Sequence, residues 1–419
     1  MRTGPCGEPP FLPAPSLRSS FAWTLAGNVF YAAAQWAILS LIAKLGGSEM
    51  LGQYALAVAL TTPLVMLSHL NLRAVLATDV DGRQPFGDYV AVRLGVSGLS
   101  LVGIAILALV SGHSGLAAVI LVTGLAQSSE TVSDIYYGAM QRRDEMALIA
   151  RSMIARGLVS VCAFGLTLYV VRDLVWALAA VAMGRVALLL AYDRPRGAAG
   201  ENLTRSGLAG EMSILRAAMP LGVMLLLVSL NTNLPRYAIE RYLGVGDLGA
   251  FAAVASFITV GSTVVNALGQ AITPKLARHF SRREPGHFLR LTFWLAASVC
   301  ALGAAGTVVA AAYGQTVLRV LYRPEYAAHG GLLVAVMGTA IPGYVAIALG
   351  YAITAARTFD AQVPLFCVVA ASCGGASWLL VPRFGLRGAA LSLALAASVQ
   401  IGGEALILAR AMHRIEAAG

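Results

Sequence analysis

Residues 21–43 read FAWTLAGNVFYAAAQWAILSLIA, a stretch of 23 residues without one ionisable side chain. A hydrocarbon layer about 30 Å thick is crossed by roughly 20 residues of α-helix, so this stretch is long enough to span a membrane. Similar apolar runs recur along the whole chain. With the first they make twelve predicted spans, near residues 21–43, 52–72, 90–110, 116–139, 153–171, 174–192, 217–238, 248–272, 291–313, 332–356, 363–381 and 387–409.

The composition agrees with a membrane protein. Of the 419 residues, 58% are hydrophobic and only 12% are charged, whereas soluble domains carry about 25% charged residues. A closed β-barrel also satisfies backbone polar groups in lipid, but its strands are alternating segments of about 10 residues. The runs here are continuous and about twice that length. The sequence therefore predicts an all-α polytopic membrane protein.

The basic residues lie between the apolar runs. In a soluble protein a net charge of +10 would favour a nucleic-acid partner, but in a membrane protein such residues set the orientation. If the N-terminus is cytoplasmic, most of the 30 basic residues fall on the cytoplasmic side. The exceptions are Lys44, Arg172, Arg236, Arg241, Arg319, Arg323, Arg383 and Arg387. We therefore expect both termini in the cytoplasm and no nucleic-acid partner.

The chain contains an internal repeat. Residues 45–55 read LGGSEMLGQYA and residues 243–252 read LGVGDLGAFA. Both have Leu-Gly, a short spacer with an acid, Leu-Gly, one residue, an aromatic residue and Ala. The two copies are six spans apart, an even number, which predicts parallel repeats related by an axis along the membrane normal. Chance similarity between Gly- and Leu-rich loops is the alternative.

The repeat predicts two pseudo-symmetric six-helix bundles. The polar, Gly-rich segment between the sixth and seventh spans is the natural linker. The expected order is a disordered cytoplasmic tail, a first bundle, a cytoplasmic linker, a second bundle and a short cytoplasmic tail, at residues 1–20, 21–192, 193–216, 217–410 and 411–419.

Two parallel bundles imply a cavity between them, as in alternating-access transporters. Polar side chains inside spans are costly in lipid and should mark that cavity. We predict a substrate cavity lined by Asn28, Gln35, His69, Asn71, Arg73, Asn231, Asn233, Arg236, Asn266 and Gln270. Aligning the halves places Gln35 against Asn233, His69 against Asn266 and Arg73 against Gln270. Hydrogen bonds between helices with a purely structural role are the alternative for the amides.

Arg73 and Arg236 are the candidates for binding an anion. A guanidinium group stays charged and offers a planar fork of donors that suits phosphate. Alternatively, both side chains lie near span ends and reach toward lipid headgroups. Pro235 removes one backbone hydrogen bond beside Arg236, which predicts a kink and a candidate hinge.

Three carboxyl groups inside spans are candidates for ion coupling. Glu130 and Asp134 are four residues apart and share one helix face, and Glu404 lies in the last span. Buried carboxyl groups can carry H⁺ or bind Na⁺. Structural ion pairs with Arg185 or Arg151 are the alternative. The sequence has no nucleotide-binding Gly-x-x-x-x-Gly-Lys-Ser/Thr motif, and we expect no metal site, cofactor or catalytic residue.

Several segments resemble a known family. Residues 27–36 read GNVFYAAAQW, residues 51–57 read LGQYALA, residues 72–79 read LRAVLATD and residues 382–390 read PRFGLRGAA. In order and spacing these segments are similar to bacterial polysaccharide-biosynthesis flippases. Those proteins export O-antigen, lipopolysaccharide and exopolysaccharide units and belong to the multidrug/oligosaccharidyl-lipid/polysaccharide exporter superfamily.

The resemblance implies a multi-pass protein of the bacterial cytoplasmic (inner) membrane with a central cationic cavity. It implies a flippase that moves an undecaprenyl-pyrophosphate-linked oligosaccharide by alternating access, with Arg73 and Arg236 as candidates for the pyrophosphate or an acidic sugar. Partners implied are the lipid-linked oligosaccharide, the bilayer, and a polymerase and glycosyltransferases of the same pathway. In one respect the chain departs from some relatives, because its first span holds no arginine.

Two other functions stay open at this point. Cation-coupled antiporters of drugs or metabolites share the superfamily's architecture. A membrane-embedded glycosyltransferase or polymerase is less favoured: Asp79 and Asp81 have the spacing of two metal-binding carboxylates, but this pattern is frequent by chance. We therefore expect a transporter and not an enzyme.

Overall fold

The structure is a computed structural model that describes residues 17–79, 84–111, 114–356, 358 and 361–417. These residues form helices and no strand. Twelve helical segments among them are long and apolar enough to cross a membrane. The prediction of an all-α protein with about twelve transmembrane helices is confirmed, and each predicted apolar run overlaps one of these segments.

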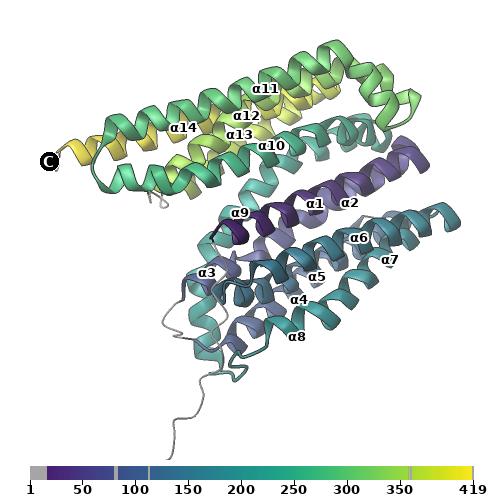
Figure 1. The fold of residues 1–419 in the computed structure, drawn as a ribbon. Helices are drawn as coiled ribbons and strands as arrows, with labels where there is room; N and C mark the ends of the chain where they lie inside the picture. The colour runs from purple at the N-terminus through teal and green to yellow at the C-terminus, as the bar shows by residue number, and fades with distance from the viewer. Residues whose placement is uncertain (1–16, 80–83, 112–113, 357, 359–360, 418–419) are drawn as a thin grey trace, which may run out of the picture.

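The first half of the chain forms one bundle, drawn in purple to blue in Figure 1. Its elements are α1 (Leu17–Leu45), α2 (Gly47–His69), α3 (Leu72–Thr78), α4 (Phe86–Val110), α5 (Ser114–Arg142), α6 (Met146–Val171), α7 (Leu174–Leu188), the π-helix η1 (Leu189–Asp193) and α8 (Arg194–Gly197).

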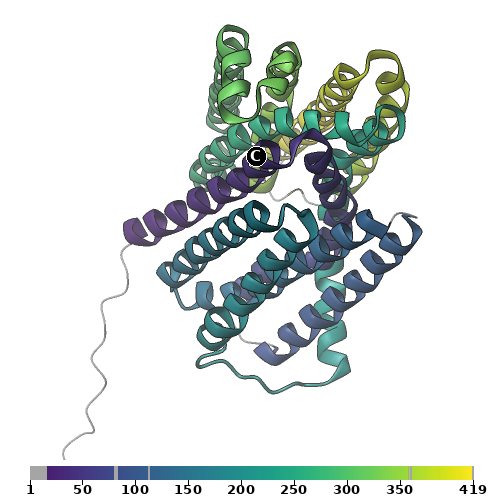
Figure 2. The ribbon, with the colours of Figure 1, turned by 90° about the vertical axis from the view of Figure 1, so that its right-hand side faces the viewer.

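The second half forms the other bundle, drawn in teal to yellow (Figures 1 and 2). Its elements are α9 (Leu208–Leu243), α10 (Val245–Ser281), α11 (Pro285–Leu321), the 3-10 helix η2 (Pro324–His329), α12 (Gly330–Ala355), α13 (Gln362–Phe384) and α14 (Leu386–Ala417).

Most helices are longer than the apolar runs in the sequence. Helix α10, for example, has 37 residues, although roughly 20 suffice to cross the hydrocarbon layer. Its final turns carry Arg278 and His279. These polar side chains can be solvated, so the helix continues beyond the hydrocarbon layer into water. Within the predicted linker, residues 193–197 and those from Leu208 onward are helical. Residues 17–20 of the predicted first tail begin α1, and the rest of that tail lies outside the described residues.

The start of α1 and the end of α14 lie on one face of the molecule. Helix α1 begins and α14 ends on the left in Figure 1, and an even number of spans separates them. We call this side the terminal face. The side at which α1 ends and α2 begins is called the opposite face.

The bundles meet most closely at the opposite face, through the repeated motif. A Cβ atom built on Gly52 of α2 would lie 1.9 Å from the carbonyl oxygen of Val245 in α10. A Cβ atom built on Gly249 of α10 would lie 1.8 Å from the carbonyl oxygen of Ser48 in α2. Gly52 corresponds to Gly249 in the repeat, and Ser48 to Val245. The contact is therefore reciprocal, as expected for two pseudo-symmetric surfaces.

Hydrophobic packing also differs between the two faces. One core cluster joins both bundles toward the opposite face, where Ile42 and Leu51 of the first bundle are buried with Leu248 and Leu318 of the second. Arg323 adds hydrogen bonds across the same face, donating to the carbonyl oxygens that end α1.

Toward the terminal face the cores are separate. One cluster holds first-bundle residues such as Leu76 and Tyr136 together with Ile214 at the start of α9. Another holds only residues of the second bundle, including Leu276 and Phe288. The two bundles are therefore joined at the opposite face and packed independently near the terminal face, apart from the first turns of α9.

Candidate functional site

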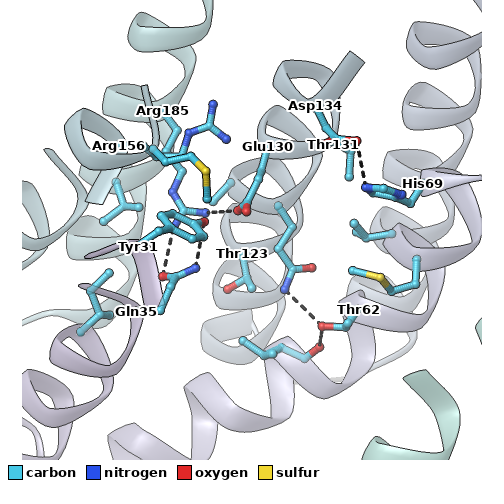
Figure 3. Close-up of a pocket in the computed structure, with 18 of the residues that line it drawn as sticks. Tyr31, Gln35, Thr62, His69, Thr123, Glu130, Thr131, Asp134, Arg156 and Arg185 are labelled. Atoms are coloured by element: carbon cyan, nitrogen blue, oxygen red, sulfur yellow. Dashed lines mark hydrogen bonds and ion pairs between the residues drawn. The ribbon is translucent and has the colours of Figure 1, made fainter. Parts of the chain in front are cut away.

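A cavity of about 350 Å³ lies inside the first bundle. Side chains from α1, α2, α3, α5, α6 and α7 line it, and Figure 3 shows many of them. Among them are five charged groups and a histidine, which is unusual for a membrane-spanning region. These are His69, Arg73, Glu130, Asp134, Arg156 and Arg185.

Helix α5 supplies one wall of the cavity. Gln127, Glu130, Asp134 and Tyr137 all line it, at spacings of three or four residues that place them along one helix face. Glu130 and Asp134 lie one turn apart, and Glu130 points toward Arg185 whereas Asp134 points toward His69 (Figure 3).

The position of Arg73 depends on a break in the second span. Leu70 and Asn71 have φ values of 50° and 49°, in the left-handed region that residues other than glycine rarely adopt. The chain turns there from α2 into α3. The turn directs Arg73 against α5, where its Nε donates to Gln141 Oε1 at 2.8 Å and its Nη1 lies 3.3 Å from Asp134 Oδ1.

A histidine completes this part of the cavity. His69 Nε2 lies 3.3 Å from Asp134 Oδ2 (Figure 3). Its Nδ1 is buried and has no hydrogen-bond partner among the described residues. Asp134 is thus held between His69 and Arg73.

Arg185 of α7 forms the centre of a second group. Its Nη1 lies 3.1 Å from Glu130 Oε2, its Nη2 donates to Gln35 Oε1 at 3.3 Å and its Nε donates to Ser160 at 3.2 Å. Gln35 in turn donates to the Tyr31 hydroxyl at 3.0 Å. This chain of hydrogen bonds connects α1, α5, α6 and α7, and Figure 3 shows Tyr31, Gln35, Glu130 and Arg185 within it.

Arg156 of α6 is fixed from behind the cavity wall. Its Nη2 lies 2.8 Å from Asp193 Oδ2, and the two side chains are 2% and 0% exposed. Asp193 also accepts a hydrogen bond from Ser152, which contacts the Tyr137 hydroxyl at 2.7 Å. Asp193 ends the π-helix η1, a local widening of the helix that is often found at functional sites.

One further arginine is buried outside the cavity lining. Arg93 of α4 is 0% exposed, and its Nη1 donates to the backbone oxygen of Ser68 at 3.0 Å. Within the part of the chain that the structure describes, its Nε and Nη2 have no hydrogen-bond partner. The Arg93 guanidinium interacts electrostatically with Asp134, so it adds positive charge behind the Arg73 end of the cavity.

The structure brings together five of the residues predicted from the sequence. Gln35, His69, Arg73, Glu130 and Asp134 all line this cavity. The other two predicted residues of the first bundle lie elsewhere. Asn28 is exposed on α1, and Asn71 is partly buried at the start of α3 without lining the cavity.

The predicted residues of α9 do not line this cavity. Asn233 is buried and donates to the backbone oxygen of Ser229 at 2.8 Å. Arg236 is partly buried and donates to Asn233 Oδ1 at 3.2 Å. The backbone oxygen of Asn231 accepts from the Cys373 thiol. Pro235 is buried within α9, which continues to Leu243; its role as a hinge stays a prediction.

The remaining predicted residues lie on α10 and α14. Asn266 accepts a hydrogen bond from the Tyr351 hydroxyl at 3.1 Å, whereas Gln270 is exposed. Glu404 is 1% exposed. One of its oxygens accepts from Gln400 at 2.9 Å, and no residue that the structure describes donates a hydrogen bond to the other.

Sequence reasoning gave no cavity role to Arg156, Asp193 or Tyr31, and considered Arg185 only as a partner of an acid. A signal for the arginines was present, since both interrupt apolar runs, at 153–171 and 174–192, and intramembrane charges are rare without a function. No sequence pattern indicated that Asp193, at the border of the predicted linker, would reach Arg156.

The sequence matches the family described as polysaccharide biosynthesis protein over residues 17–280. The chain belongs to this family. The capsular polysaccharide biosynthesis protein CapF of Staphylococcus aureus is 25% identical over 390 residues, which cover 91% of this chain and 96% of that protein.

Solved transporter structures share the fold. The lipid II flippase MurJ in an inward closed conformation has a TM-score of 0.73 at 10% identity, over 94% of this chain and 90% of that one. The MATE transporter VcmN of Vibrio cholerae in its bent form has a TM-score of 0.62 at 12% identity, over 95% and 97%. A MOP superfamily transporter from Pyrococcus furiosus scores 0.64 at 14% identity, over 96% and 95%. The family member described here thus has the fold of these transporters, with two six-helix halves.

Proposed function

We propose that this protein is a flippase that moves a lipid-linked oligosaccharide of polysaccharide biosynthesis across the bacterial inner membrane. The observation that carries the proposal is the charged and polar cavity inside a membrane-spanning bundle. Family membership supports the pathway, and the fold shared with MurJ supports transport of a lipid-linked substrate. O-antigen and exopolysaccharide units are the substrates we consider first.

The cavity chemistry suits a substrate with an anionic head and a sugar chain. Arg73 is 29% exposed and has Arg93 behind it, so a pyrophosphate is attracted to this end of the cavity. Amide and hydroxyl groups of Gln35, Gln127 and Thr62 also line the cavity, and such groups hydrogen-bond to sugars. The lipid tail stays in the bilayer during transfer.

The bundles move relative to each other in the proposed cycle. The structure is joined at the opposite face and packed separately near the terminal face, which is the arrangement for loading from the terminal face. The distribution of basic residues along the sequence predicts that this face is cytoplasmic. Rocking of the bundles then exposes the substrate on the periplasmic side, where a polymerase of the same pathway consumes it.

Arg73→Ala is expected to reduce export of polysaccharide by at least about tenfold, because a charge-assisted contact to phosphate contributes more than about 1.4 kcal/mol. The measurement is surface polysaccharide in a strain whose own flippase gene is replaced by the variant. Arg241→Ala removes an exposed arginine at the end of α9 and is the control. Normal export with Arg73→Ala would contradict the role of this arginine.

Arg236 remains the second-bundle candidate for anion binding. Its neighbour Tyr237 donates to the backbone oxygen of Ala59 in α2 at 2.5 Å, and other residues of α2 line the cavity. Because Arg236 does not line the cavity in this state, its role would fall in another state of the cycle.

Coupling to H⁺ or Na⁺ is proposed through Glu404 rather than through the cavity acids. Glu130 and Asp134 are paired with arginines, whereas the described residues place no arginine, lysine or histidine in an ion pair with Glu404. A buried carboxyl group without a cation favours the protonated form or a bound cation.

Glu404→Gln is expected to abolish any acceleration of transport by an ion gradient while leaving gradient-free transport intact. The measurement is lipid translocation in vesicles with and without an imposed proton or sodium gradient. Equal acceleration of the wild-type protein and the variant would remove Glu404 from the ion path.

Antiport of a cationic drug or metabolite is the second candidate function. The observation that favours it is the pair of carboxylates Glu130 and Asp134 on the cavity wall. A competition experiment distinguishes the two functions. Inorganic pyrophosphate should inhibit transport if the cavity binds the head of a lipid-linked oligosaccharide, whereas an organic cation should inhibit transport if the protein is an antiporter. The enzymatic alternative considered from the sequence depends on Asp79 and Asp81. Asp79 accepts a hydrogen bond from the Tyr89 hydroxyl at 3.1 Å, and Asp81 lies outside the described residues.

A further inference from the structure

The arginines of the cavity are individually paired with carboxylates. Three arginines line the cavity, and each has one acidic partner within 3.3 Å. The pairs are Arg73–Asp134, Arg185–Glu130 and Arg156–Asp193. These pairs give each of the three arginines a counter-ion when no substrate is bound.

The pairs are of two kinds. In the pair Arg156–Asp193 both side chains are at most 2% exposed, and the acid lies outside the cavity lining. In the other two pairs the acid itself lines the cavity. Glu130 is 35% exposed and covers Arg185, which is only 6% exposed.

This arrangement has an electrostatic consequence. A buried arginine without a counter-ion is strongly unfavourable, so Arg185 needs an anion in every state of the protein. Glu130 provides that anion when the cavity is empty. It is exposed enough to swing away if a substrate phosphate takes its place.

We propose that Glu130 and Asp134 are the resident counter-ions of the cavity, and that the anionic group of the substrate displaces them from Arg185 and Arg73. This inference rests on the proposed function and adds a mechanism for the empty protein. Because each arginine that lines the cavity keeps a carboxylate partner when no substrate is bound, the protein can return to the loading state without an anion. Asp193 is never displaced and holds Arg156 in position throughout.

The test uses the full-length protein in lipid nanodiscs and inorganic pyrophosphate as the probe. Calorimetric titration at low, fixed ionic strength gives the Kd of the wild-type protein, of Glu130→Gln and of Asp134→Asn. The amide variants keep the side-chain shape but no longer compete with the probe for the arginine. We expect each to bind pyrophosphate at least about tenfold more tightly than the wild type does.

Two controls make the result specific. Glu211→Gln makes the same chemical change at an acid that pairs with Arg205 in the connection to α9, and its Kd is expected to equal that of the wild type. Thermal unfolding with and without pyrophosphate shows whether the variants are folded. Glu130→Gln is expected to have a lower melting temperature without the probe and a larger rise with it.

The outcomes separate this inference from the proposed function. If the wild type binds pyrophosphate and Arg73→Ala does not, but folded Glu130→Gln and Asp134→Asn bind no more tightly, the counter-ion inference is overturned and the flippase proposal stands. If pyrophosphate binds to none of these proteins, the anion-binding cavity itself is wrong and both fail.

Discussion

Gly52→Val and Gly249→Val are each expected to stop transport, because both glycines lie where the backbones of α2 and α10 nearly touch. A Cβ atom at either position would lie less than 2.0 Å from a carbonyl oxygen of the other helix. Neither neighbour is a flexible side chain that can move aside, so the helices must separate. Overpacking costs up to about 3 kcal/mol, which corresponds to roughly a 100-fold shift away from the state closed at the opposite face.

The shift is measured by chemical labelling. After the five cysteines have been replaced, Val58→Cys places a reporter among the cavity residues. A membrane-impermeant maleimide added on the opposite face should label this reporter rapidly in the glycine variants and slowly in the parent. Gly246→Ala is the matched control, since it lies on α10 near Gly249 but no atom lies within 4 Å of its added Cβ. Equal labelling rates in all variants would show that this contact does not close the opposite face.

Among the single substitutions proposed for this protein, Asp193→Ala is expected to produce the largest loss of folding stability. It removes the counter-ion of Arg156 in a pair whose side chains are 2% and 0% exposed, and breaking such a pair costs about 3–5 kcal/mol. It also removes the acceptor of the Ser152 hydroxyl. The measurement is the thermal midpoint of the purified protein, compared with Asp173→Ala. Asp173 caps the exposed start of α7, so that change should cost only about 1 kcal/mol.

A double variant separates the structural role of the pair from its role in the cavity. Arg156→Met with Asp193→Leu replaces both charges by apolar groups, which is often nearly neutral for stability. The thermal midpoint should recover, whereas transport should not, because Arg156 lines the cavity. Recovery of transport together with stability would assign Arg156 a structural role alone.

The sequence predicted the fold well because the bilayer imposes a simple constraint. An apolar run of about 20 residues has few alternatives to a membrane-spanning helix, and all twelve runs are helical. The repeated motif predicted two halves, and the reciprocal contact of Gly52 with Val245 and of Gly249 with Ser48 shows why the motif recurs. Both copies need a glycine at the same close approach of two backbones.

The candidate site was less predictable, because distances between helices are not encoded in spacing along the chain. Aligning the repeats placed Gln270 at the position of Arg73, yet one is exposed and the other lies in the cavity. The reason is local: α2 breaks at Leu70 and Asn71, whereas α10 continues to Ser281. Because α10 has no such break, Gln270 is not turned toward the interior of its bundle as Arg73 is.

The central claim is that this protein turns a lipid-linked oligosaccharide over between the two leaflets. The most direct measurement uses the purified protein in liposomes that contain a fluorescent, pyrophosphate-linked oligosaccharide lipid, with a membrane-impermeant quencher outside. The wild-type protein should expose the lipid of the inner leaflet to the quencher, and Arg73→Ala should slow this exposure at least about tenfold. Quenching in wild-type vesicles that is no faster than in protein-free vesicles would contradict the account.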